Sequence, residues 1–226
     1  ATATVTTSSS GMSAAAAAAL INGVSYRDTA SVPTFGARVV TLTSVTDNGG
    51  TAYGGSDTTV LSLSATVSVQ GVPVVSTSGG SASFTAGDNT AATPVTVDGG
   101  LTVSDPDSAT LASATVAITG NFQAGEDVLG FTAGGAFGNI SGSYNSGTGV
   151  LTLTSAGASA TLAQWQAALR SVTYTDSAVT PNGATRTIMF QLNDGAGSGA
   201  AASRAVTVTA VDQTPIASAS GGAAAF

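Results

Sequence analysis

The residues of this chain that could carry chemistry are carboxylates. Asp and Glu together number twelve, Lys and Arg five, Glu126 is the only Glu, and there is no His or Cys. Without His the chain lacks the usual general base and the commonest zinc ligand, and without Cys it lacks thiolate metal sites and disulfides. What remains is acid–base work by paired carboxylates, or binding of a hard cation such as calcium.

Glu126 and Asp127 are adjacent in the sequence. Such a pair would suit either the acid and base of a glycosidase or two calcium ligands. Neighbouring side chains on a strand point to opposite faces of the sheet, so the two carboxyls would not converge on one substrate atom there. We therefore predict that Glu126 and Asp127 form a loop acid pair without a catalytic role.

Asp105 and Asp107 flank a proline in the segment SDPDS. One interpretation is a turn in which the Asp side chains accept hydrogen bonds from nearby backbone N–H groups. The other is a pair of cation ligands, because calcium takes about six to eight oxygen ligands and stabilises close carboxylates. The chain has no G-x-S-x-G, Walker, EF-hand or GGxGxD motif, so we expect that it is not an enzyme.

Charge and hydropathy exclude several classes of partner. The net charge is -7 and the pI is about 4.1, and such a surface repels phosphate backbones and anionic lipids. No apolar run approaches the roughly 20 residues that span a bilayer. We expect neither nucleic-acid binding nor membrane insertion. Secretion without Cys is typical of bacterial extracellular proteins, and the export signal would be encoded outside this stretch.

Most of the chain has the pattern of short strands. Hydrophobic residues make up 42% and there are 29 Gly, as expected for half-buried strands joined by tight turns. Apolar residues alternate with small or polar ones in five segments, Val60–Val69, Ala114–Ile118, Gly149–Ser155, Arg186–Asn193 and Ala205–Val211. This alternation, with Gly- and Asn-rich turns between the segments, predicts antiparallel hairpins stacked into a β-sandwich.

One segment, Thr161–Ser171, has the pattern of a short helix instead. Leu162, Trp165 and Leu169 recur at helical spacing, and Thr161 with Gln164 has the form of a capping box. A tryptophan on such a stripe packs in a core more often than it stacks on a sugar. We predict that Trp165 is a core residue.

The sequence repeats itself. Ser13–Arg38 aligns without a gap on Thr161–Arg186, an offset of 161 − 13 = 148, and Val72–Phe84 aligns on Thr214–Phe226, an offset of 214 − 72 = 142. The self-match predicts a tandem repeat. It also predicts that Ala14–Ala19 forms the same short helix in the first copy.

The period divides the chain into three parts. Residues 1–73 would be the C-terminal half of a degenerate repeat and residues 74–215 a complete repeat. Residues 216–226 would be the first strand of a following repeat, or a segment donated to another subunit. An excerpt from a longer array explains this arrangement, as does a filament subunit whose open half is completed by a neighbouring chain.

The motif series LTVSDPDSATLASATVAI, GEDVL, TGVLTLT, RTIMFQLNDG and AVTVTAVDQTP resembles the cadherin-like repeats of large bacterial surface adhesins. The resemblance implies an all-β fold of tandem antiparallel cadherin-like or Ig-like β-sandwiches, to which the helical pattern described above adds one short helix per repeat. It also implies calcium near domain junctions. On that basis Asp105 and Asp107 match an Asp-x-Asp ligand pair, Asp194 an acidic position before the last strand, and Asp212 the linker acid. The preceding linker, QGVPV, offers no carboxylate.

The expected function is that of a secreted structural or adhesive module, which extends or rigidifies a protein on the bacterial cell surface. Its expected partners are neighbouring repeats of the same or identical chains. One alternative is a self-assembling extracellular filament or surface-layer subunit, a homopolymer joined by strand exchange. A weaker alternative is a carbohydrate-binding accessory module with Tyr53, Phe137 and Tyr144 as its aromatic platform.

Overall fold

The protein is described here from a computed structural model, which describes residues 2–6, 12–30, 33–47, 50 and 56–217. The chain divides into two compact units, Ala1–Gln70 (unit 1) and Gly71–Phe226 (unit 2). Strands account for 41% of the structure and helices for 12%, so strands dominate, in agreement with the predicted all-β class. In the described part of the chain, no helix is long and apolar enough to cross a membrane.

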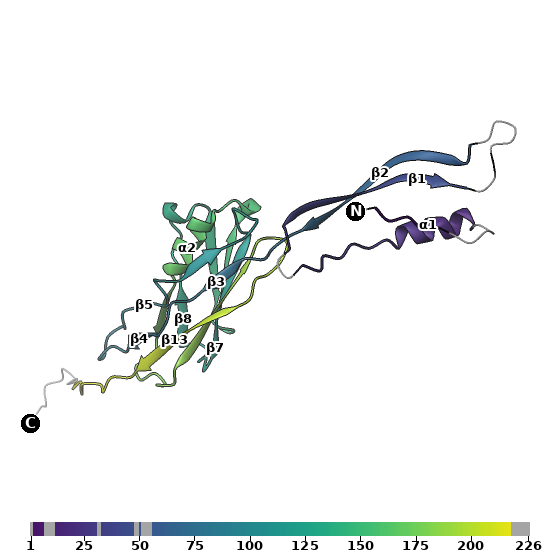
Figure 1. Cartoon of the computed structure of the whole chain (residues 1–226). Helices are drawn as coiled ribbons and strands as arrows, with labels where there is room; N and C mark the ends of the chain where they lie inside the picture. Colours follow the sequence, from purple (N-terminus) through teal and green to yellow (C-terminus); the bar gives the residue numbers. More distant parts are fainter. Residues whose placement is uncertain (1, 7–11, 31–32, 48–49, 51–55, 218–226) are drawn as a thin grey trace, which may run out of the picture. The chain divides into compact units, whose positions relative to one another are not determined.

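In its described residues, unit 1 has one helix and one pair of strands, labelled α1, β1 and β2 in Figure 1. Helix α1 spans Ala14–Asn22, and the Ser13 side chain caps it by accepting a hydrogen bond from the Ala16 N–H. Strands β1 (Gly36–Thr46) and β2 (Thr58–Val69) pair antiparallel. The predicted helix and the predicted strand over Val60–Val69 are both present.

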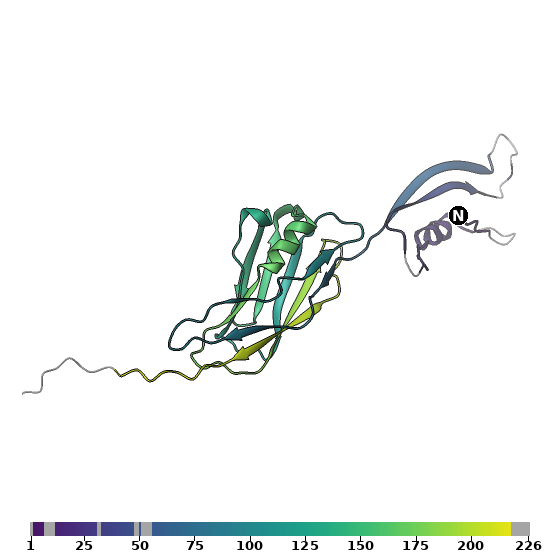
Figure 2. The same ribbon diagram turned by 60° about the vertical axis from the view of Figure 1, so that its left-hand side comes forward.

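Unit 2 contains the remaining elements. Its strands are β3 (Val74–Ser76), β4 (Ser81–Thr85), β5 (Val95–Thr96), β6 (Thr102–Ser104), β7 (Ser113–Gly120), β8 (Asp127–Gly130), β9 (Ile140–Asn145), β10 (Val150–Ser155), β11 (Thr173–Asp176), β12 (Arg186–Asn193) and β13 (Ala202–Thr209). Helix α2 spans Leu162–Arg170, and two short 3-10 helices, η2 and η3, span Gly135–Phe137 and Ala156–Ala158. Both views of unit 2 show α2, in green, beside the strands (Figure 2).

The strands of unit 2 form three sheets. The largest has the order β4-β13-β12-β7-β10-β9, the second β5-β11-β8, and the third pairs β3 with β6. Strand β4 lies parallel to β13, whereas the other pairs among the described strands are antiparallel. The expected antiparallel arrangement therefore fails at this one pair. A parallel pair needs a long connection, and β4 and β13 are separated by most of unit 2.

The core of unit 2 collects apolar side chains from both larger sheets and from α2. Val116 and Phe190 come from the six-stranded sheet, Leu129 and Tyr174 from the three-stranded sheet, and Trp165 from α2. All five side chains are buried in one contiguous cluster. Removing this apolar surface from water supplies the main driving force for folding.

Helix α2 begins and ends as its sequence predicts. The Thr161 hydroxyl accepts from the Gln164 N–H at 3.3 Å, and the Gln164 side chain accepts from the Thr161 N–H at 2.8 Å, which completes the capping box. Trp165 is fully buried, and its indole N–H donates to the Leu111 carbonyl at 3.0 Å. The prediction that Trp165 is a core residue is confirmed.

Candidate functional site

Asp105 and Asp107 lie in the loop that follows β6. Asp105 Oδ1 accepts hydrogen bonds from the backbone N–H groups of Asp107 and Ser108, at 3.0 and 2.8 Å. Both carboxyl oxygens of Asp107 accept from the Gly71 N–H at 3.1 Å. The contacts of Asp105 are those of the predicted Asp turn, whereas Asp107 binds an N–H 36 residues away in the sequence. The second oxygen of Asp105, Oδ2, is buried and has no hydrogen-bond partner.

Asp194 shows the same combination in the loop between β12 and β13. Its Oδ1 accepts from the N–H groups of Ala196 and Gly197, both at 2.7 Å. Its Oδ2 is buried and without a hydrogen-bond partner. A buried carboxylate oxygen without a donor is energetically costly, so Asp105 and Asp194 each retain one oxygen able to accept a proton donor or a cation.

The segment Gly71–Pro73 borders both of these loops. A Cβ on Gly71 would lie 2.3 Å from the Pro106 ring, and one on Gly199 would lie 1.7 Å from the Pro73 carbonyl. The two glycines therefore permit the backbone of Gly71–Pro73 to approach the loops closely. The loops that carry Asp105, Asp107 and Asp194 thus share one neighbouring segment.

Asp212 occupies a different position. It is exposed in the coil that follows the C-terminal end of β13, whereas Asp194 lies before the N-terminal end of that strand. Within the residues that the structure describes, no group of three or more Asp, Glu, His or Cys side chains is placed to hold a metal ion. Calcium binding by the four Asp residues therefore stays a prediction.

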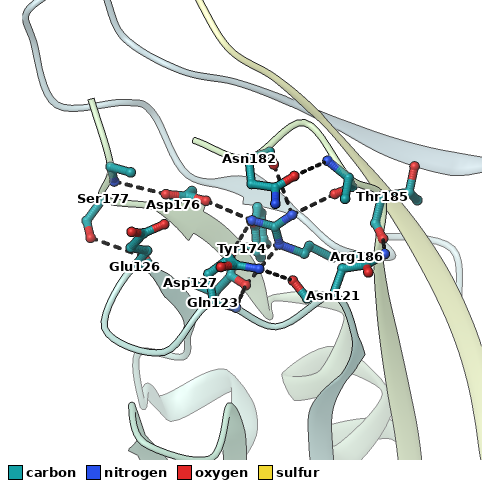
Figure 3. A network of polar contacts seen from close by, with 12 residues as sticks. Asn121, Gln123, Glu126, Asp127, Tyr174, Asp176, Ser177, Asn182, Thr185 and Arg186 are labelled. Atoms are coloured by element: carbon teal, nitrogen blue, oxygen red, sulfur yellow. Dashed lines mark hydrogen bonds and ion pairs between the residues drawn. The ribbon is translucent and has the colours of Figure 1, made fainter. Parts of the chain in front are cut away.

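A second polar cluster, absent from the sequence-based site, is centred on Arg186 at the start of β12 (Figure 3). Its Nε donates to both oxygens of Asp127, at 3.0 and 2.9 Å, and its Nη2 donates to Asp176 Oδ2 at 3.1 Å. Its Nη1 donates to the carbonyls of Asn182 and Ala184, at 3.0 and 2.6 Å. The Arg186 and Asp127 side chains are completely buried, as is that of Asp176 in its ion pair with Arg186.

Asp127 links this ion-pair cluster to tyrosines on strands of both larger sheets. Its Oδ1 accepts from the Tyr174 hydroxyl at 2.5 Å, and its Oδ2 accepts from the Gln123 N–H at 2.7 Å. The Asp127 carbonyl accepts from the Tyr144 hydroxyl at 2.7 Å. The cluster therefore connects β8, β9, β11 and β12 through a buried ion pair with additional hydrogen bonds, the condition under which such pairs are stable.

The environment of this cluster shifts several pKa values. Burial raises the pKa of Tyr174, and the hydrogen bond to Asp127 raises it further. Burial and the charge of Asp127 raise the pKa of Tyr144 to about 12. Burial lowers the pKa of Arg186, but its contacts with Asp127 more than offset this, so the pKa of Arg186 is raised. Arg186 stays charged and the tyrosines stay protonated at neutral pH, which suits a structural cluster.

The predicted loop acid pair at Glu126 and Asp127 is wrong as to Asp127. Asp127 is the first residue of β8 and is fully buried, while Glu126 precedes the strand and is half-buried. Neighbouring side chains on a strand point to opposite faces of the sheet, but this alternation does not say which of the two faces the core. One signal was available: Arg186 alternates with Ile188 and Phe190, so it shares their inward face and needs a buried anion.

Asp98, in the loop between β5 and β6, forms a further buried charged site with Ser78 of the β3–β4 turn. Its Oδ1 accepts from the Ser78 hydroxyl at 2.5 Å and from the Gly100 N–H at 3.0 Å, and its Oδ2 accepts from the Ser78 N–H at 2.8 Å. Arg204 Nη1 lies 3.9 Å from Asp98 Oδ2. Burial raises the pKa of Asp98, but the Ser78 and Gly100 hydrogen bonds and Arg204 outweigh it, so this pKa is lowered from its ordinary value.

Asp98 should make the stability of unit 2 sensitive to acid. Because its folded pKa lies below the unfolded value, its stabilising effect is present above that value and is lost as pH falls through the folded pKa. We expect Asp98→Asn to cost about 1–3 kcal/mol at pH 7 and to flatten the loss of stability below about pH 4. Urea unfolding from pH 7 to pH 2 measures both effects, and parallel pH profiles for the two proteins would contradict the assignment.

The aromatic side chains proposed as a sugar platform are not freely exposed. Phe137 and Tyr144 are half-buried and pack against the core, and Tyr53 lies outside the described residues. The rings of Phe131 and Phe137 lie 5.6 Å apart, beside a shallow pocket of about 230 Å³. This placement leaves Phe137 and Tyr144 little free ring surface for stacking on a sugar.

Comparison with known proteins gives no identification. No protein-family model, no curated protein and no solved structure matches this chain. Its function must therefore be inferred from its own residues and their geometry.

Proposed function

We propose that unit 2 is a complete β-sandwich repeat of the cadherin-like or Ig-like kind within a tandem array. The array acts outside the cell as a structural or adhesive module that extends or rigidifies a bacterial surface protein. The observation that carries this proposal is the recurrence of the same local hydrogen bonds at residues 148 positions apart. Recurrence of this kind is typical of repeat proteins, which reuse one structural unit along the chain.

The arginine at the start of β1 and that at the start of β12 make equivalent contacts. Arg38 donates to the carbonyls two and four residues before it, those of Gly36 and Thr34, at 3.4 and 2.5 Å. Arg186 also donates to the carbonyls two and four residues before it, at 2.6 and 3.0 Å. The offset is 186 − 38 = 148.

Three further features recur at the same offset. Asp28 Oδ1 accepts from the Ala30 N–H at 2.9 Å, and the matching oxygen of Asp176 accepts from the N–H two residues later, also at 2.9 Å. The N-cap residues of α1 and α2 are Ser13 and Thr161, and each helix has nine residues. The agreement of independent local details supports one ancestral unit present twice in the chain.

The rigidity of unit 2 supports a load-carrying role. The Arg186 cluster connects strands of both larger sheets, so separating the sheets would expose a buried ion pair. Repeats with such cross-links between sheets are suited to transmit force along an extended array.

Calcium would fit the oxygen atoms available near the start of this repeat. Asp105 and Asp194 each have one buried oxygen without a hydrogen-bond partner, and Asp107 adds a carboxylate nearby in sequence. Such oxygens are the ligands that calcium prefers. Asp105, Asp107 and Asp194 would have to draw together to share the ion, since as described they form no such group, and Asp212 would serve the next junction.

A thermal unfolding curve in calcium and in chelator tests this proposal. A ligand that binds only the folded state stabilises it by about 2.7 kcal/mol at a hundred times its dissociation constant. We therefore expect calcium to raise the unfolding midpoint of the chain by several degrees. The rise should disappear in the double variant Asp105→Asn with Asp107→Asn.

Glu126→Gln is the matched control, since it removes one carboxyl from a different loop of unit 2. It should keep the calcium response. A midpoint that is the same in calcium and in chelator would reject the calcium site and leave Asp105 and Asp107 as turn formers.

A filament or surface-layer subunit is the second candidate, and one observation favours it. In the described residues, β1 and β2 pair only with each other, so each has a free edge. The segment Thr214–Phe226 matches Val72–Phe84, which contains β4, the strand that pairs in parallel with β13. A neighbouring chain could therefore supply a strand to β2.

A further inference from the structure

Unit 1 exposes an apolar face that has a buried counterpart in unit 2. None of the described residues of unit 1 is buried. Val40 on β1 is 42% exposed and Leu63 on β2 is 63% exposed. On β12, Ile188 and Phe190, which match Val40 and Leu42 at the offset of 148, are both fully buried.

The pairing registers place these residues on one face of each strand pair. Arg38 is opposite Val67 and Leu42 is opposite Leu63 on β2, just as Arg186 is opposite Val206 on β13. Side chains two residues apart and their direct cross-strand partners point to the same side of a sheet. The acceptor face of unit 1 is therefore formed by six residues, namely Arg38, Val40, Leu42, Leu63, Ala65 and Val67.

Helix α1 also exposes apolar side chains whose counterparts in unit 2 are buried. Leu20 and Ile21 are 42% and 40% exposed, whereas Ala168 and Leu169, their counterparts on α2, are fully buried. Large apolar residues exposed together on a helix and on a sheet indicate a surface that is covered when the protein functions.

In unit 2 the cover comes from the front half of the repeat, between β3 and β10. Strand β7 pairs antiparallel with the edge of β12, with Val116 opposite Phe190. Leu129 on β8, also within the front half, belongs to the same core. Strand β1, the counterpart of β12, has no such neighbour among the described strands.

The ion pairs of unit 2 indicate which kind of segment would cover the acceptor face of unit 1. Arg186 has ion pairs with Asp127 and Asp176, and Asp127 also accepts from Tyr174. In unit 1, Arg38 makes the carbonyl contacts of its counterpart but has no ion pair with any described residue. Tyr26, the counterpart of Tyr174, is 40% exposed and donates to Asp28 at 3.4 Å. Of these residues of the unit 2 cluster, Asp127 is therefore the one that has no counterpart among the described residues of unit 1.

The C-terminal segment of a second copy does not supply this carboxylate. Thr214–Phe226 corresponds to β3 and β4 and contains no acidic side chain. At most it could add a strand along β2, which would leave Arg38 and the edge of β1 unpaired.

We propose that the acceptor face of unit 1 binds a front-half segment with the sequence pattern of Val74–Thr148, in which an aspartate equivalent to Asp127 pairs with Arg38 and accepts from Tyr26. This inference rests on the repeat in the proposed function. The bound segment adds a strand to the edge of β1 as β7 does to β12. It also covers Val40 and Leu63 as Ile188 is covered in unit 2.

The repeat offset gives a direct test, since Ala1 matches Gly149. A second copy of Val74–Thr148 fused before Ala1 would place a front-half segment in register with unit 1. We expect the backbone amides of β1 and β2 to exchange with deuterium at least roughly a hundredfold more slowly in the fused chain than in the unextended chain. The measurement is made without calcium, so its failure is separate from failure of the calcium site.

Two variants of the fused chain test the charge. Asp127→Asn in the added copy alone should reduce the protection of β1 and β2, and Glu126→Gln in the added copy should not. Unit 2 of the same molecule is the internal control, because its exchange rates should stay unchanged.

Two results would overturn the proposal. One is exchange in β1 and β2 that is equally fast with and without the added segment. The other is protection of β2 in the unextended chain that depends on protein concentration and is lost when Thr214–Phe226 is deleted. That result would assign the face to the C-terminal segment of a second copy, as in a filament.

Discussion

Replacing Asp127 with Ala is expected to destabilise unit 2 by about 3–5 kcal/mol, because it leaves the guanidinium of Arg186 buried and largely unpaired. Arg186 has no exposed surface, and only Asp176 would remain as its ion-pair partner. The Tyr174 hydroxyl and the Gln123 N–H would lose their acceptors as well. A loss of this size is a large part of the roughly 5–15 kcal/mol that stabilises a typical domain.

Urea unfolding of the full chain measures this effect, with tryptophan fluorescence reporting on unit 2 because the single tryptophan is Trp165. Glu126→Gln, at the neighbouring position, is the control and should change stability by less than about 0.5 kcal/mol. The double variant Asp127→Ala with Arg186→Ala should cost much less than the sum of the single variants, since it removes both charges. Additive costs would show that the two residues do not act as a pair.

The parts of the fold that were predicted correctly depend on local sequence. Thr161 and Gln164 complete a capping box within one turn of chain, and Trp165 is placed inward by a spacing of three to four residues. The alternation in Arg186–Asn193 gives strand β12 with the same bounds. Local propensity and hydrophobic periodicity agree in these segments, so few alternative structures compete.

The parts that were missed depend on contacts between distant residues. Asp127 meets Tyr174 and Arg186, which follow it by 47 and 59 residues. No local pattern distinguishes this buried Asp from the Asp of a turn, because the partners that bury it are distant in the sequence. The parallel pairing of β4 with β13 is equally non-local, since its register is set by the folded sheet and not by a hairpin turn.

The geometry of the candidate calcium residues depends partly on local sequence and partly on contacts between distant residues. Their spacing is visible in the sequence, and the local hydrogen bonds of Asp105 and Asp194 follow from the turn chemistry of Asp. The buried Oδ2 atoms of these two residues depend on how the loops pack against Gly71–Pro73. Such packing cannot be derived from the loop sequences alone.

Trp165→Ala should be the second severe substitution, with an expected cost of about 3–5 kcal/mol. The indole is the largest fully buried side chain of unit 2, and its removal leaves a cavity between α2 and the sheets. It also leaves the buried Leu111 carbonyl without its N–H donor. Ala163 lies exposed on the same helix, so Ala163→Ser is the matched control and should change stability by less than about 0.5 kcal/mol.

Trp165→Phe separates the two contributions of the indole. Phe keeps much of the ring volume but has no N–H, so it should cost about 1–3 kcal/mol through the unpaired Leu111 carbonyl and a smaller cavity. Since both variants lack the fluorophore, far-UV circular dichroism in urea is the readout. If Trp165→Ala unfolded at the same urea concentration as the parent chain, α2 would not be part of the cooperative core.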